Sequence, residues 1–183
     1  MTRISEQELR FVFIEQFNKH SPNSWYYSVE TPTVWKYRFT GVEKPHKTKK
    51  GGQSAMTDVC IHDETGKRIC LIEFKFGNPE EFSFTKDLVK LKEEGGLCFF
   101  VHLLKSQGSS TLKSIVGKVG SDLENTVFIC HTIEGKTTQY ISTSNEEFSG
   151  TEWTLIKEEQ RKYLYEEYLE DKKKRKNKKA QSK

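Results

Sequence analysis

Several features that would place a protein in a common class are missing from this sequence of 183 residues. Its four cysteines form no CxxC pair, which argues against zinc and redox motifs, and we expect reduced core cysteines in an intracellular protein. No apolar run approaches the roughly 20 residues that a membrane span needs, and the first residues, MTRISEQELRF, lack the apolar core of a signal peptide. The sequence therefore predicts a soluble, cytoplasmic protein with no membrane partner.

Acidic residues are absent from the last twelve positions, KKKRKNKKAQSK, which hold eight of the 30 Lys and Arg. The rest of the chain has 22 basic and 26 acidic residues, a net charge of −4. We therefore expect a single domain over residues 1–170 and a disordered lysine-rich tail over 171–183. The tail is either a solvated chain end or a nucleic-acid contact, and a nuclear location arises only if the source is eukaryotic.

Histidine is scarce and scattered, so the five histidines predict no zinc site and no histidine nucleophile. His102 lies within the apolar run LCFFVHLLK, where we expect an interior residue. A chain of this length can bury roughly two-thirds of its unfolded surface in one core, so it needs no disulfide scaffold.

The first third of the chain shows helical spacing and then strand composition. Ser5 and Glu8 form a capping-box pattern ahead of apolar residues at helical spacing, which predicts a helix over 6–19. Residues 25–40 are rich in aromatic and β-branched side chains and predict one or two strands interrupted near Pro32. The basic segment 41–55 predicts an exposed, mobile loop.

The remaining residues alternate between strand and helix patterns. After a hairpin over 56–77, a helix that Ser83 or Thr85 could cap leads to Gly95-Gly96 and then to a buried strand at 97–105. A second helix and strand follow over 110–135, and a last helix is expected over about 155–170. This order predicts an α/β sandwich in which helices flank a mixed central β-sheet.

The hairpin MTDVCIHDETGKRICLIEFKFG carries charges inside apolar strands. Side chains alternate along a strand, so the pairing register decides which face Asp58 occupies. A register that pairs Val59 with Ile72 makes one face wholly apolar and sets Asp58 opposite Glu73 on the other. We expect this register, which a bulge would upset.

In that register Asp58, Glu73 and Lys75 share one face. Two close carboxylates repel each other unless a divalent cation bridges them, and hard oxygen ligands, including the backbone carbonyl of Phe74, favour Mg²⁺ or Mn²⁺. Lys75 would then orient or help to deprotonate an attacking water, or offset charge on a phosphate. The alternative is a half-exposed strand with an ordinary Glu-Lys pair, although the run ICLIEFKF is apolar enough for a central strand.

Asp58, followed after fourteen residues by Glu73-Phe74-Lys75, resembles the motif of the PD-(D/E)xK nuclease superfamily, over a region from the first helix to about Leu104. Thr57 stands where the motif has proline, a departure that the family tolerates. The resemblance implies a restriction-endonuclease-like fold, magnesium held by Asp58 and Glu73, and Lys75 as the catalytic lysine. It also implies that the chain acts on nucleic acid, with DNA favoured over RNA, and a homodimer is among the assemblies known for such enzymes.

Many members of this family have a further acid on the first helix that faces the metal site. Glu8 matches the family position better than Glu15, which lies seven residues later on the same face. The alternative for Glu8 is a capping role with Ser5.

Residues around the hairpin offer contacts to phosphates. Basic and small polar side chains precede the hairpin, and two lysines lie four apart on the following helix. The candidates for nucleic-acid binding are Lys47, Lys49, Lys50, Gln53, Ser54, Lys86 and Lys90. A solvated loop with ordinary surface lysines is the alternative.

The leading hypothesis from the sequence is a magnesium-dependent nuclease, an endonuclease on DNA, that hydrolyses phosphodiester bonds with Asp58, Glu73, Lys75 and Glu8. The first rival is a catalytically inactive module of the same fold that binds nucleic acid or a partner protein. A third hypothesis is a small structural protein that its tail tethers to polyanions.

Overall fold

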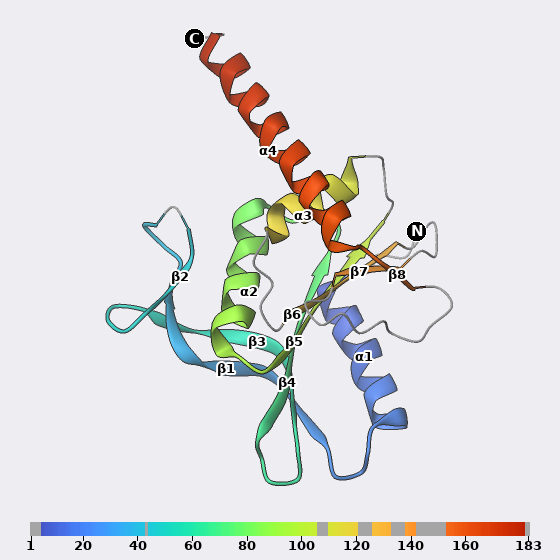
Figure 1. Cartoon of the computed structure of the whole chain (residues 1–183). Coiled ribbons are helices and arrows are strands. Elements are labelled where there is room, and N and C mark those ends of the chain that lie inside the picture. The colour runs from blue at the N-terminus through green and yellow to red at the C-terminus, as the bar shows by residue number, and fades with distance from the viewer. Residues whose placement is uncertain are drawn as a thin grey trace.

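A mixed β-sheet runs through the whole computed structural model, which describes residues 5–42, 44–105, 110–120, 126–132, 138–141 and 153–181 (Figure 1). Within these residues the sheet has eight strands in the order β2-β1-β3-β4-β5-β6-β7-β8. The strands are β1 (Tyr26–Arg38), β2 (His46–Thr48), β3 (Gln53–His62), β4 (Arg68–Phe76), β5 (Leu97–Leu104), β6 (Thr126–Thr132), β7 (Thr138–Ile141) and β8 (Trp153–Leu155). The helices are α1 (Glu6–His20), α2 (Glu81–Glu94), α3 (Thr111–Val119) and α4 (Glu158–Gln181).

The sheet changes from antiparallel to parallel at β4. Strands β1, β3 and β4 pair antiparallel, whereas β5 lies parallel to both β4 and β6, with α2 and α3 as the connecting helices. Parallel strands need such crossovers, and the helices cover both faces of the central strands. The prediction of an α/β fold with helices on a mixed central sheet is therefore confirmed.

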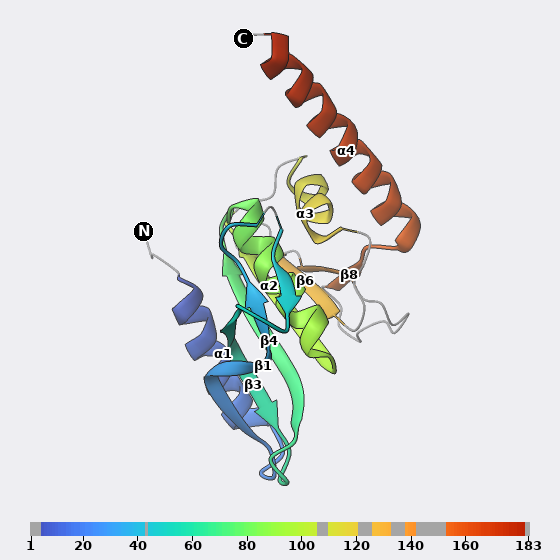
Figure 2. The ribbon, with the colours of Figure 1, turned by 90° about the vertical axis from the view of Figure 1, so that its left-hand side faces the viewer.

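Each face of the β3–β4 hairpin has its own core. One apolar face, which includes Val59, Ile72 and Phe74, packs against the aromatic side chains Phe13 and Phe17 of α1. The other core lies between the sheet and α2 and α3, and the two views show α1 on the side of the sheet opposite to these two helices (Figures 1 and 2). The face that carries Asp58 and Glu73 is therefore covered by α2 rather than open to solvent.

The pairing of β3 with β4 follows the expected register. Val59 pairs with Ile72 and Ile61 with Cys70, and the register shifts only at His62, near the turn. The shift lies beyond the acidic residues, so it does not move Asp58 to the apolar face. The register prediction is confirmed.

The expected loop over residues 41–55 is wrong at two segments, 46–48 and 53–55, which are strands. Strand β2 pairs with the end of β1, and β3 already begins at Gln53, so the segment forms an arm of two short strands and a turn. Glycine allows this close approach, because a Cβ at Gly52 would lie 2.9 Å from the carbonyl oxygen of Tyr37. Strand β1 is continuous, with a register shift between Pro32 and Lys36 in place of a break.

The expected cap of α2 also differs. Neither Ser83 nor Thr85 caps this helix, which begins after Glu80 without a side-chain cap, and the Thr85 hydroxyl donates to the carbonyl of Glu81. The predicted end is confirmed, because Gly95 follows the last turn with a φ of 73°. The capping box of α1 is present as predicted.

The lysine-rich segment is helical up to Gln181, which contradicts the expected disorder of the tail for the residues that the structure describes. Ion pairs fix the start of this segment: Lys113 lies 2.6 Å from Asp171, and Lys172 lies 2.8 Å from Glu81. These contacts join α4 to α3 and α2, so helix formation continues from an anchored turn. None of the helices in the described part of the chain has the length and apolar character needed to cross a bilayer.

Candidate active site

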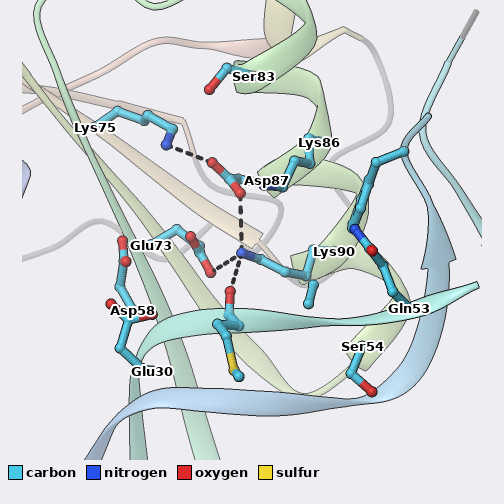
Figure 3. Close-up of a pocket in the computed structure, with 13 residues that line it drawn as sticks. Glu30, Gln53, Ser54, Asp58, Glu73, Lys75, Ser83, Lys86, Asp87 and Lys90 are labelled. Atoms are coloured by element: carbon cyan, nitrogen blue, oxygen red, sulfur yellow. Dashed lines mark hydrogen bonds and ion pairs between the residues drawn. The ribbon is translucent and has the colours of Figure 1, made fainter.

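A cavity of about 330 Å³ lies between the β3–β4 hairpin and α2 (Figure 3). Asp58 from β3 and Glu73 and Lys75 from β4 line it, as the register predicts, together with Asp87 and Lys90 from α2. The alternation of the strands turns the three hairpin side chains to one face, and the helix closes that face. The sequence motif therefore corresponds to one cavity in three dimensions.

Asp58 lies at the open side of the cavity. Its Oδ2 accepts a hydrogen bond from the backbone N–H of Phe74 at 2.8 Å, and Arg10 of α1 lies 3.8 Å from Oδ1. Arg10 also pairs with Glu30, another residue of the cavity wall. Phe74 thus contacts Asp58 through its N–H, while the predicted role of its carbonyl as a metal ligand stays a prediction.

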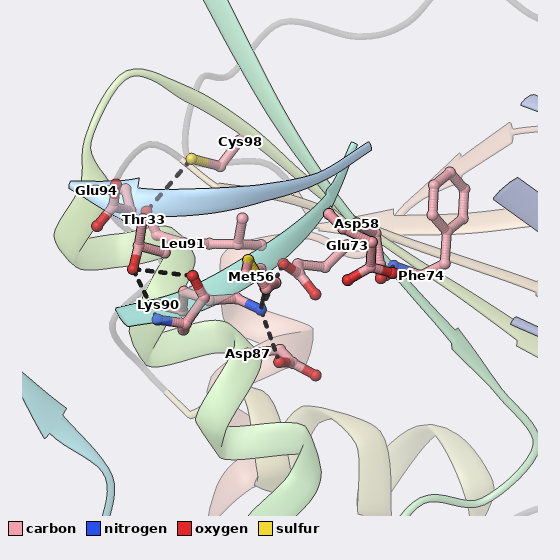
Figure 4. Close-up of polar contacts among 12 residues, drawn as sticks. Thr33, Met56, Asp58, Glu73, Phe74, Asp87, Lys90, Leu91, Glu94 and Cys98 are labelled. Carbon is pink, nitrogen blue, oxygen red and sulfur yellow. Dashed lines mark hydrogen bonds and ion pairs between the residues drawn. The ribbon is translucent and has the colours of Figure 1, made fainter. Parts of the chain in front are cut away.

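Lys90 has a different role from the predicted contact with nucleic acid. Its Nζ lies 2.6 Å from Oε1 of Glu73 and 3.1 Å from Oδ1 of Asp87 (Figure 4). The same ammonium donates to the carbonyl oxygen of Met56 at 2.6 Å. Because Lys90 is only 2% exposed, it is a buried partner of Glu73 and not a surface contact for phosphates.

Asp87 joins the two lysines of the cavity. Its Oδ2 lies 2.7 Å from Nζ of Lys75, and its Oδ1 faces Lys90. Glu6 of α1 lies 3.6 Å from the same Lys75 ammonium. Charges of alternating sign therefore run from Glu73 through Lys90, Asp87 and Lys75 to Glu6.

The protonation of these groups follows from burial and from their neighbours. Burial raises the pKa of Glu73 well above its ordinary range; Asp87 and Asp58 act in the same direction, and Lys90 opposes them. Burial lowers the pKa of Lys75 and of Lys90, but nearby carboxylates outweigh it, chiefly Asp87 for Lys75 and Glu73 for Lys90, so both values are raised. Burial raises the pKa of Asp87, but the two lysines outweigh it and the net shift is downward. Both ammonium groups thus stay charged at neutral pH.

The acid contributed by α1 differs from the prediction. Glu8 completes the capping box, where its Oε2 accepts from the Ser5 N–H at 2.5 Å, and it does not line the cavity. Glu15 pairs with Lys19 at the surface. Glu6, two residues before Glu8, is the acid of α1 that reaches Lys75, and it also accepts a hydrogen bond from the Phe76 N–H.

The predicted nucleic-acid contacts divide into three groups. Gln53, Ser54 and Lys86 line the cavity as expected, and the Lys86 ammonium lies over the ring of Phe39. Lys49 and Lys50 are exposed in the turn of the arm. Lys47 is 2.6 Å from Glu93 and lies over the Trp35 ring, so its charge is partly neutralised by α2.

One sequence pattern could have identified the α2 residues. Phe84, Leu88 and Leu91 form a buried stripe at helical spacing, and Asp87 falls inside it. An acid on the apolar face of a helix is costly unless it is paired, so Asp87 marks a buried charge. Lys90, three residues later, is its nearest partner in the sequence.

The donor set is compatible with a hard divalent cation. Three carboxylates, Asp58, Glu73 and Asp87, and two ammonium groups, Lys75 and Lys90, line the same cavity. Mg²⁺ is often bound by one or two carboxylates and several waters, so Asp58 and Glu73 are the residues that could hold such an ion. No cluster of three or more His, Cys, Asp or Glu side chains suited to a metal occurs in the part of the chain that the structure describes.

Comparisons of the chain with protein-family models, with curated proteins and with solved structures found no match.

Proposed function

We propose that the protein is a metal-dependent nuclease with a restriction-endonuclease-like fold, which hydrolyses phosphodiester bonds. The observation that carries this proposal is that Asp58, Glu73 and Lys75 line one cavity. Charged side chains are costly to bury, and a purely structural role does not explain why Asp58, Glu73 and Lys75 line the same cavity.

In this proposal Asp58 and Glu73 hold a Mg²⁺ ion, for which Mn²⁺ substitutes. The bound cation would polarise a phosphate oxygen and lower the pKa of water. Lys90 acts on Glu73, because it holds one carboxylate oxygen and so fixes the orientation of the other. This makes Lys90 a positioning residue.

Lys75 has a more specific role than the sequence alone suggested. The Asp87 carboxylate, 2.7 Å away, favours the charged form of Lys75, so the side chain is a poor proton acceptor at neutral pH. We infer that it orients the attacking water and offsets negative charge on the phosphate in the transition state. Asp87 positions it for that role.

The proposed substrate is nucleic acid, with DNA favoured over RNA. Lys86, Gln53 and Ser54 at the cavity wall, with the exposed Lys49 and Lys50 of the arm, supply contacts to the phosphate backbone that carry no sequence information. Such contacts position a strand over Asp58 and Glu73 without selecting a sequence.

A second candidate is a catalytically inactive module of the same architecture that binds nucleic acid or a partner protein. The observation that favours it is the direct ion pair of Glu73 with Lys90. The Lys90 ammonium already compensates the negative charge of Glu73, which a bound metal ion would otherwise compensate. This candidate predicts binding of nucleic acid without cleavage.

The test is incubation of the purified protein with plasmid, linear duplex and single-stranded DNA and with RNA, in Mg²⁺ or in EDTA. Nuclease activity predicts cleavage of at least one substrate in Mg²⁺ and none in EDTA. Lys75→Met should reduce the rate by about 100-fold or more, because a charge-stabilising group is removed from the transition state. Binding without cleavage under every condition supports the inactive module and overturns the nuclease.

A further inference from the structure

The second half of α4 is an isolated cationic rod. From Lys172 to the end of the chain the sequence contains no acid, and the side chains of Lys173, Lys174, Arg175, Lys176 and Lys178 are exposed. Both views show this half of the helix leaving the body of the protein (Figures 1 and 2). These five exposed cations are called the α4 cluster below.

The rod begins at a fixed point of the fold. Tyr168 packs against Gly117 of α3 so closely that even a Cβ at position 117 would overlap its ring. One turn later, Asp171 pairs with Lys113 and Lys172 pairs with Glu81. The α4 cluster is therefore presented at a defined position.

The ion pair of Lys172 with Glu81 also places the start of the cationic half of α4 close to the cavity. Glu81 belongs to the first turn of α2, and Ser83, two residues later, lines the cavity. The base of the rod therefore lies at the end of α2 that borders the candidate active site.

The composition of the second half of α4 indicates what kind of partner it can bind. Residues 172–181 contain no large apolar side chain, so the helix has no face that could enter a membrane interface or an apolar groove. Like charges three and four residues apart destabilise a helix by a few tenths of a kcal/mol per pair, and a closely spaced polyanion removes that repulsion. The five cations lie within about 8 Å along the axis, and duplex DNA carries one phosphate per about 1.7 Å.

We propose that the α4 cluster binds the phosphate backbone of duplex nucleic acid at a site separate from the cavity. The helix contributes affinity without sequence preference and needs no metal and no cleavage. The proposal is thus independent of the proposed hydrolysis, and either can fail without the other.

The experiment measures the affinity of the full chain for a fluorescent DNA duplex of about 30 base pairs, in EDTA, between 50 and 200 mM salt. The variant replaces all five cluster residues by Gln, which keeps helix propensity. We expect the slope of log K against log salt to be shallower by about 2 to 4, because each phosphate contact contributes about 0.9. At 50 mM salt the affinity should fall at least about tenfold.

A matched control replaces Arg161 and Lys162, two cations in the first half of α4, by Gln. Lys162 is already paired with Glu158, and we expect this variant to keep the slope of the parent. Thermal unfolding of both variants should match that of the parent, because Lys162 and the five cluster side chains are exposed and Arg161 is partly exposed.

Equal salt slopes for the parent and the cluster variant would overturn the proposal. It would also be overturned if the cluster variant lost binding to vesicles rich in phosphatidylserine while its binding to the duplex was unchanged, because the partner would then be a membrane.

Discussion

The Nζ atom of Lys90 lies 2.6 Å from Oε1 of Glu73, and each side chain is only 3% exposed. The desolvation of two buried charges costs free energy, so a buried ion pair adds little net stability. Removal of one partner is strongly destabilising, because the other charge is then buried without compensation. The ion pair also connects α2 to the central strand β4 at the proposed site. The stability of the core and the arrangement of the site therefore depend on the same contact.

Lys90→Met should lower the free energy of unfolding by about 3 to 5 kcal/mol, because Glu73 and Asp87 would lose their buried partner. Urea unfolding at pH 7.5 measures this change. In the double variant with Glu73→Gln the loss should be clearly smaller than in the single variant, since no unpaired Glu73 charge is left. Equal losses of unfolding free energy in the single and the double variant would show that the unpaired Glu73 charge does not cause the destabilisation.

Glu94→Ala should destabilise the contact of α2 with β1. The Glu94 carboxylate accepts hydrogen bonds from the N–H groups of Val34 at 2.7 Å and Trp35 at 3.0 Å. It also accepts one from the hydroxyl of Tyr37 at 2.9 Å. Truncation leaves these donors without their acceptor, at a cost of about 1 to 3 kcal/mol in urea unfolding.

The neighbouring acid provides the control for Glu94. Glu93 pairs with Lys47 nearer the surface, where both side chains are about one-third exposed, so Glu93→Ala should cost less than about 1 kcal/mol. Equal effects of the two substitutions would contradict the role assigned to Glu94.

Gly117→Ala should loosen the contact of α3 with α4. The new methyl group would overlap the Tyr168 ring, and overpacking of about 1 to 3 kcal/mol outweighs the gain of up to about 1 kcal/mol from replacing a helical glycine. Hydrogen exchange of the α4 amides should become faster. In a Tyr168→Ala background the same substitution should be neutral or stabilising, and a loss in both backgrounds would contradict the proposed overlap.

His102 should make stability depend on pH. Burial lowers its pKa to about 4, and its Nε2 lies 2.7 Å from the carbonyl oxygen of Gly77. The unfolded chain takes up the proton near pH 6.5, whereas the folded chain does so only near pH 4, so this contribution is complete above pH 6.5 and is lost as the pH falls toward 4. Its size is at most about 3 kcal/mol.

Urea unfolding from pH 4 to 7.5 checks this prediction against His102→Gln, in which the carboxylates still titrate. The stability of the parent should fall more steeply on acidification than that of the variant. Identical slopes would show that His102 is not the titrating group.

The hairpin could be predicted from the sequence because its alternation leaves only one register with a wholly apolar face. The register in turn placed Asp58, Glu73 and Lys75 correctly on one face. The position of Lys90 was missed, because it depends on how α2 is rotated against the sheet, and only Asp87 inside the apolar stripe of this helix indicates that rotation. An isolated lysine on a helix is more often at the surface.

The strands of the arm and the helical state of the lysine-rich end of α4 were missed for different reasons, although a helix over the first half of α4 was predicted. The arm contains Gly51, Gly52 and several lysines, which are typical of loops, and its strands form only by pairing with β1. The helical lysine segment has a composition typical of disorder, and it is anchored by partners distant in the sequence, Lys113 and Glu81.

The rate of Mg²⁺-dependent plasmid cleavage by the parent and by Asp58→Asn tests the central proposal most directly. Asparagine keeps the size of the side chain and an acceptor for the Phe74 N–H, so the hairpin should remain folded. Loss of one carboxylate ligand predicts a rate at least about 100-fold lower than that of the parent, and EDTA should abolish the activity of the parent. Equal rates for the two proteins, or cleavage by the parent in EDTA, would contradict a nuclease that holds its metal on Asp58 and Glu73.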